Sequence, residues 1–447
     1  MSEPSRLAEL IRAYCARVRP AILAQHSKSS VSSSLGIWLL LAAAAPAIGD
    51  EGKRVELEEV LGCPSGEAAE LLADFLAHQP KAVSGALAVW TRKLAHTKAF
   101  EAWSADLPKT VESGAMPTQS SADAWADQHT KGMIKQFPLL ITPETVFLLA
   151  SALATDVRWQ TQFDLAPADS LGFSPWADRV AHVLTDPREG TGHTNAIVQT
   201  ESAGLVAAHA ALATEGLKVI TLIGDPSLER GAVLAAAHEV AELFRSPGQA
   251  TSAKQVSLFD LPLGPGYAWE ISERVIRTSA GPGKRFEKLI SYAPAWRIDG
   301  TPIDLLDESF GATAAINGLF TLLPAPTPEV KYEAAAAQKA FAQYGKAGFR
   351  AAAVTAFAGA MRITGIPKSY EARERTAILR FNRPFGALAL VQDDRESPRW
   401  DGLPVFEAWV HDPEEAKDEP AEAQEPQEDL SLGGRRIGWT DTRHRRS

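Results

Sequence analysis

The sequence has little cysteine and no apolar run long enough to cross a membrane. Among its 447 residues only Cys15 and Cys63 are cysteines, which excludes a disulfide framework in a chain of this size. We expect two buried thiols. The longest apolar run, residues 35–48, is interrupted by Gly36 and Pro46 and is shorter than the roughly 20 residues that a spanning helix needs. It predicts a buried helix and no membrane contact.

The sequence also has no basic stripe interleaved with aromatic residues, and its formal net charge is −10. This excludes nucleic acid as the expected partner. Residues 1–30 mix acidic and basic side chains without an apolar centre, so no signal peptide is predicted. We therefore expect a cytoplasmic protein, with an extracellular location by another route as the alternative.

Enzyme motifs are missing as well. The ten histidines include no His-Glu-x-x-His pair, and Gly-x-Ser-x-Gly does not occur. The Gly-Pro-Gly-Lys at 281–284 lacks the earlier glycine and the following hydroxyl residue of a phosphate-binding loop. We predict that the protein is not an enzyme and has no cofactor or metal site.

The residues that are present predict an α+β protein. Hydrophobic residues make up 45% of the chain, enough for a large core. Helical and strand-like segments follow one another without the regular alternation of a doubly wound sheet. The expected helices are residues 6–24, 35–48, 55–61 and 66–78, and the expected strands include 146–153 and 218–223.

The composition changes sharply at Glu414. Residues 414–429 are acidic and rich in proline and alanine, and five arginines follow between 435 and 446. Such a segment cannot bury enough apolar surface to order itself. We predict one domain over residues 1–413 and a disordered charged tail over 414–447, with a docking arm as the alternative role of the tail.

An alanine-rich segment and the sequence after it carry a family resemblance. A glycine, Gly348, precedes a run of small residues that ends near Arg362, and Phe-Asn-Arg-Pro-Phe at 381–385 opens two apolar runs, 386–391 and 403–410. This order resembles the serpin family, in which the glycine starts a reactive-centre loop and the final strands are buried.

Segments nearer the N-terminus agree with this resemblance. Residues 122–134 are similar to the family's helix before the central strand, and residues 145–159 to that strand, with Trp159 at the top of the main sheet. The order of segments agrees from about residue 6 to 413. The resemblance implies a large mixed or antiparallel main sheet with surrounding helices and an exposed reactive-centre loop over about 348–380.

The resemblance implies a serine-type endopeptidase inhibitor that acts as a suicide substrate, by cleavage and insertion of the loop. The expected partner is a trypsin-like or subtilisin-like serine protease, and the inhibitor is expected to be a monomer. Counting from Gly348 places the reactive bond at Arg362–Ile363, whereas counting back from Phe381 gives Arg373–Glu374; we prefer Arg362, where the small-residue run ends. The alternative function is that of a non-inhibitory serpin-fold binding protein.

The hinge departs from the family pattern. Strand alternation places Ala351 and Ala353 on the same face as Phe349. Phe349 stands where a small hydroxyl residue is usual, and an oversized side chain typically costs roughly 1–3 kcal/mol in a prepared slot. Lys346 stands two positions before the hinge glycine, where the family has an acidic residue.

In the sheet-opening region, Ser151 and Gln338 replace an asparagine and a histidine that face each other, and we interpret them as a compensated pair. Residues 332–344 have helical propensity. The resemblance predicts that they form the strand leading into the loop.

Overall fold

The computed structural model describes residues 5–92, 97–245, 251–324, 335–349, 370–392 and 398–417. No helix in this part of the chain is long and apolar enough to cross a membrane. The helices are α1 (Arg6–Gln25), α2 (Ser34–Ala44), α3 (Glu51–Leu61), α4 (Ser65–Ala77), α5 (Lys98–Asp106), α6 (Gln119–His129), α7 (Arg230–Arg245) and α8 (Ala312–Phe320).

The helices predicted near the N-terminus are confirmed. Ser5 caps α1 by accepting a hydrogen bond from Ala8 N, and the apolar stripe of the helix is buried. The run 35–48 forms α2 and a 3-10 helix, Ala45–Ala47, because Pro46 supplies no amide to continue the α-helix. Both cysteines are free and buried, as expected.

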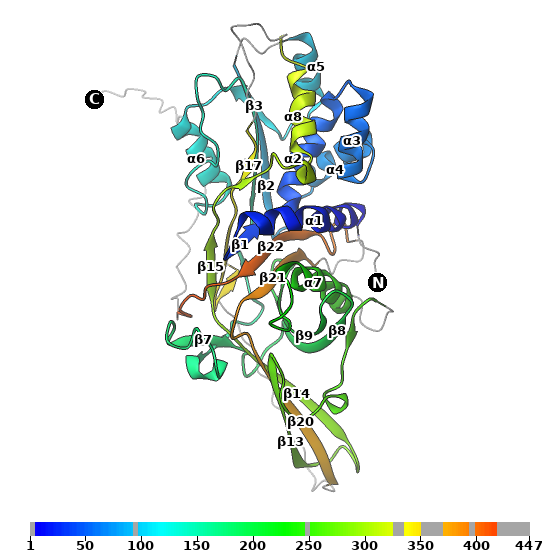
Figure 1. The fold of residues 1–447 in the computed structure, drawn as a ribbon, viewed down its shortest axis with the longest axis vertical. Helices are drawn as coiled ribbons and strands as arrows, with labels where there is room; N and C mark the ends of the chain where they lie inside the picture. The colour runs from blue at the N-terminus through cyan, green and yellow to red at the C-terminus, as the bar shows by residue number, and fades with distance from the viewer. Residues whose placement is uncertain are drawn as a thin grey trace, which may run out of the picture.

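A seven-stranded sheet lies in the middle of the molecule (Figure 1), and all neighbouring strands in it are antiparallel. Helix α7 packs against it through an apolar cluster that includes Val233 and Val240. In spatial order its strands are β1 (Ser30–Ser32), β22 (Pro404–Val410), β21 (Phe385–Val391), β10 (Leu217–Ile223), β9 (Gly204–Leu212), β8 (His193–Thr200) and β11 (Lys254–Gln255).

A buried ion pair crosses this core. Glu407 on β22 accepts hydrogen bonds from Arg19 of α1 at 2.7 Å and is 2.6 Å from Nε2 of His238 on α7. Burial alone would raise the pKa of Glu407, but the Arg19 guanidinium and the His238 imidazole outweigh burial and lower it to about 2. The carboxylate therefore joins two helices to the sheet as a charged group.

Three strands of a six-stranded mixed sheet, β13, β14 and β20, form the extension at the lower end of the molecule in Figure 1, and β7 of the same sheet lies above them. Strand β20 lies inside it, antiparallel to β13 and parallel to β14. The spatial order is β12 (Gly264–Pro265), β13 (Trp269–Thr278), β20 (Tyr370–Arg380), β14 (Arg285–Ala293), β7 (His182–Thr185) and β6 (Asp164–Pro167).

The remaining strands form smaller sheets. A three-stranded sheet has the order β3 (Glu112–Ala115), β2 (Ser84–Thr91) and β4 (Phe147–Ala154), and three strand pairs join β16 (Ile303–Asp304) to β17 (Ala337–Gln338), β15 (Trp296–Asp299) to β18 (Phe341–Tyr344), and β5 (Val157–Arg158) to β19 (Gly348–Phe349). The predicted α+β class is confirmed. Within the described part of 332–344 the chain is extended, because pairing with β15 and β16 overrides helical propensity.

The predicted start of the tail needs correction. The amide of Glu414 donates to Ala295 O at 2.7 Å, and the Glu415 carboxylate accepts hydrogen bonds from the amides of Ala181 and His182. Ala416 is buried. The described body therefore extends to residue 417, and the remainder of the predicted tail, 418–447, lies outside the described residues.

Candidate functional site

Among the described strands, a gap separates β4 from β17 and β18. Strand β4 pairs with β2 over its whole length, from Phe147 to Ala154. Strand β17 pairs with β16, and β18 pairs with β15. Within the described residues no ladder joins β4 to β17 or β18, so each side presents a backbone edge to the other.

The gap is closed at one end by β5 and β19. Gly348 lies opposite Arg158, and Phe349 lies opposite Val157. Trp159 extends this closure, because its amide donates to Ala347 O at 3.2 Å and its indole Nε1 donates to Gly345 O at 3.0 Å. The tryptophan predicted for the top of the main sheet thus lies at the closed end of the gap.

The two described hinge residues are built into this closure. A Cβ added at Gly348 would overlap the carbonyl oxygen of Val157, so the close approach of the two strands requires glycine. Phe349 is buried and packs edge-on against Trp296, with 6.2 Å between ring centroids. The aromatic ring is therefore already accommodated between β5 and Trp296 in this structure. Ala351 and Ala353 lie outside the described residues.

A mostly apolar cavity of about 150 Å³ lies in the gap, and residues of both β4 and β17 line it. Side chains of α2 and α6 also contribute, among them Ile37 and Trp125. Among the described residues that line it there is no His, Cys, Asp or Glu. In the described part of the chain, the cavity therefore offers no ligand set for a metal and no catalytic pair, but it offers space between two backbone edges that have no strand partner there.

Ser151 and Gln338 meet at this cavity, but they do not hydrogen-bond to each other. Ser151 Oγ donates to Gly36 O at 3.1 Å, and the Gln338 amide both donates to Ser33 O and accepts from Ser33 N. Both side chains therefore anchor the edges of the gap to the start of α2. We interpreted Ser151 and Gln338 as a pair that compensate each other directly. The structure shows instead that each side chain bonds to the backbone at the start of α2.

Sequence reasoning did not identify Ser33 and Gly36 as part of this region. The available signal was the serine run before the apolar helix, which is typical of an N-cap. Ser33 does accept a hydrogen bond from Gly36 N and caps α2.

The predicted loop boundaries, 348–380, need correction at both ends. Residues 348–349 form β19 and residues 370–380 form β20. Arg373 lies inside β20, opposite Val275 on one side and Arg285 on the other. The alternative bond Arg373–Glu374 is therefore held in a paired strand. The preferred bond, Arg362–Ile363, lies outside the described residues, in the stretch that connects the two strands.

No known family model matches the chain, and no curated protein matches it. Solved structures do match. Tengpin, a thermophilic serpin in its native state, has a TM-score of 0.61 at 14% identity, with 92% of this chain and 95% of tengpin covered. Mouse protein-Z dependent protease inhibitor has a TM-score of 0.57 at 12% identity, with 92% of this chain and 98% of that chain covered.

Thyroxine-binding globulin in complex with thyroxine matches equally well, with a TM-score of 0.57 at 13% identity and 91% and 99% coverage of the two chains. These structures include a protease inhibitor and a thyroxine-binding protein, so the likeness concerns the fold alone. The chain has the serpin fold, as the resemblance predicted.

Proposed function

We propose that the protein inhibits a trypsin-like or subtilisin-like serine protease by acting as a suicide substrate. The gap between β4 and the strands β17 and β18 carries this proposal, because the described residues leave both of its edges unpaired and give it an apolar cavity and a closed end formed by the residues that precede the loop. A chain segment that enters as a new strand gains ladder hydrogen bonds on both sides.

The chemistry begins at Arg362, which fits the carboxylate-bearing pocket of a trypsin-like protease. The protease serine attacks the Arg362 carbonyl, the bond to Ile363 breaks, and the new Ile363 amine leaves with a proton. Arg362 remains bound to the enzyme as an acyl ester. The freed segment then continues from β19 into the gap, while β20 stays in its own sheet.

The position of Phe349 sets the register of insertion. Since this side chain is buried, alternation along an inserted strand would direct Ala351 and Ala353 to the buried face as well. Both side chains are small, which suits a narrow space between two strands and two helices. The second candidate function is a non-inhibitory binding protein, and the apolar cavity is the observation that favours it.

Trypsin incubated with the full chain is expected to give a covalent complex that survives a denaturing gel. Arg362→Ala should reduce complex formation at least tenfold, because the pocket loses its cationic partner. Mass spectrometry of the released fragment should give Ile363 as its first residue. Arg373→Ala serves as the matched control, since this side chain is exposed on a paired strand and its loss should leave the complex unchanged.

Two outcomes oppose this proposal. Clean cleavage after Arg362 without any complex would favour the binding function, and cleavage elsewhere in the chain would overturn the assignment of the reactive bond.

A further inference from the structure

Three potential metal ligands lie close together near the closed end of the gap, next to Tyr344. Asp186 follows β7, His193 begins β8 and His209 lies within β9, and one ligand atom of each lies within 4.8 Å of the others. The His209 side chain is 3% exposed and that of Asp186 is 17% exposed. The cluster is therefore buried on the His209 side and open to solvent on the Asp186 side.

Two of the three distances between these atoms are close to those around a tetrahedral ion, and the third pair, His193 and Asp186, lies within 4.8 Å. His193 Nδ1 is 3.2 Å from His209 Nε2, and His209 Nε2 is 3.5 Å from Asp186 Oδ1. A zinc ion with ligands at about 2.0–2.1 Å has neighbouring ligand atoms about 3.3–3.4 Å apart in a tetrahedron. Two imidazoles and one carboxylate are ligands that zinc accepts, with a fourth position left for water.

Each ligand is also held from behind. His193 Nε2 donates to Thr161 O at 2.6 Å, and His209 Nδ1 faces the Tyr344 hydroxyl at 3.4 Å. The second oxygen of Asp186 accepts hydrogen bonds from Asn195 Nδ2 and from Ser291 N. Outer partners of this kind fix the ring orientation and tautomer of metal-binding histidines.

Each histidine turns one ring nitrogen toward the cluster, because its other ring nitrogen faces a partner outside the cluster. Asn195 Oδ1 is buried and has no hydrogen-bond partner among the described residues, so the cluster also contains an unsatisfied oxygen next to the carboxylate.

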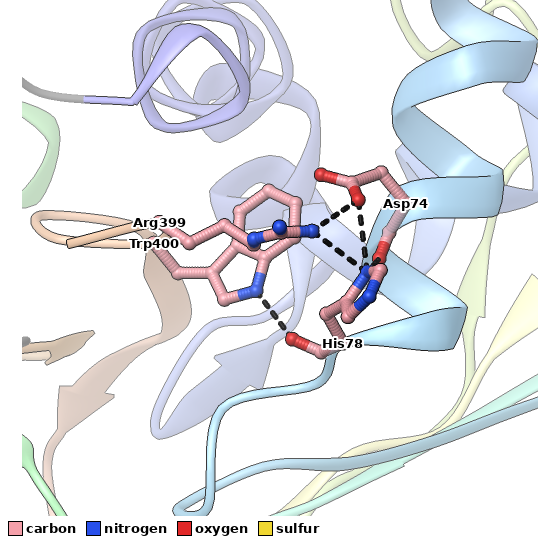
Figure 2. A network of polar contacts seen from close by, with 4 residues as sticks. All are labelled: Asp74, His78, Arg399 and Trp400. Atoms are coloured by element: carbon pink, nitrogen blue, oxygen red, sulfur yellow. Dashed lines mark hydrogen bonds and ion pairs between the residues drawn. The ribbon is translucent and has the colours of Figure 1, made fainter. Parts of the chain in front are cut away.

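Two other groups of histidine and carboxylate side chains are less suited to a metal ion, because an arginine forms an ion pair with the carboxylate in each of them. The buried group Cys15, His238 and Glu407 contains the Arg19 guanidinium. Figure 2 shows the exposed pair Asp74 and His78, where Arg399 lies against both side chains. In the part of the chain that the structure describes, no Lys or Arg is paired with Asp186.

We propose that Asp186, His193 and His209 bind a zinc ion. The ion would link β8 and β9 to the segment of Thr161 and, through His209, to Tyr344 on β18. Tyr344 directly precedes the residues whose carbonyls bond Trp159 at the closed end of the gap. The site thus lies where the strands around the gap are joined. The proposal is independent of protease inhibition.

Titration of the full-length protein with Co²⁺ tests the site without any activity measurement. We expect one equivalent of cobalt to give the intense visible d–d bands of tetrahedral coordination, without thiolate charge-transfer absorption, and one equivalent of Zn²⁺ to remove them. His193→Gln should weaken cobalt binding more than the roughly 10–100-fold caused by loss of an outer partner. Its Gln side chain keeps a donor for Thr161 O.

Asp186→Asn is a second variant that keeps an acceptor for Ser291, and it should also weaken binding. His78→Gln is the matched control, and it should bind cobalt like the wild type because Arg399 already occupies that pair. A wild type without tetrahedral bands overturns the proposal. So does undiminished binding in both site variants, and so does thiolate charge-transfer absorption, which would place the ion at a cysteine.

Discussion

Cleavage of the chain between β19 and β20 is expected to raise the melting temperature by about 10 °C or more, since in a large domain about 1 kcal/mol corresponds to roughly 2 °C. In the intact chain β4 and the strands β17 and β18 face each other without a ladder between them in the described residues. A segment freed at Arg362 can follow β19 into this gap and satisfy both edges, each new hydrogen bond contributing about 0.5–1.5 kcal/mol net. A thermal scan before and after limited proteolysis measures the rise.

Two neighbouring loop positions provide a matched pair of variants. Ala353→Asp places a carboxylate on the face that alternation from Phe349 directs inward, and the cost of burying it should abolish most of the rise in melting temperature. Val354→Asp places the same group on the opposite face, and the rise should persist. Neither change creates a tryptic site. Equal behaviour of the two variants would contradict the proposed register.

Glu407→Gln is expected to destabilise the folded protein by about 3–5 kcal/mol, because it leaves the Arg19 guanidinium buried without its counter-charge. Denaturant unfolding measures this loss. Glu270→Gln is the control, since Glu270 pairs with Arg380 at an exposed position and surface pairs contribute only about 0–1 kcal/mol.

Because of the same carboxylate, we expect the free energy of unfolding to fall at acidic pH. The pKa of Glu407 is lowered from 4.5 to about 2 in the folded state, so its contribution is complete above about pH 4.5 and is lost as the pH falls toward 2. This loss of stability at acidic pH should be smaller in Glu407→Gln. An equal loss of stability in both proteins over this range would assign the acid sensitivity to other groups.

The helices near the N-terminus were predictable because their apolar spacing and caps are local. Residues 6–24 and 35–48 carry these signals in a short stretch of sequence, and α1 and α2 follow them closely. The extended chain at β17 and β18 was not predictable from propensity. Its conformation is set by β15 and β16, more than 30 residues earlier in the chain, and only the family resemblance predicted it.

The C-terminal boundary of the predicted loop shows why a strand with many charged residues is hard to predict from sequence. Residues 371–376 read Glu-Ala-Arg-Glu-Arg-Thr, which suits an exposed loop. They become a strand because β13 and β14 provide partners on both sides and because Glu273 pairs with Arg375. These partner strands lie far away in the sequence, so the residues of β20 alone do not indicate them.

The same limit applies to the candidate metal ligands and to Glu407. Asp186, His193 and His209 have no motif spacing, and they meet only when β8 has paired with β9 and β7 has paired with β14 in a second sheet. Glu407 lies in an apolar run, and its partners come from α1 and α7. The position of Trp159, by contrast, followed from the resemblance, because it depends on the order of segments rather than on individual contacts.

Hydrogen exchange of the intact and the loop-cleaved protein tests the central claim most directly, namely that the gap beside β4 receives the freed segment. We predict that amides of β4 and of β17 and β18 exchange more slowly after cleavage, because their free edges gain partners. Amides of β21, which is paired on both sides in the intact chain, should not change. Unchanged exchange at β4 in fully cleaved protein would contradict insertion.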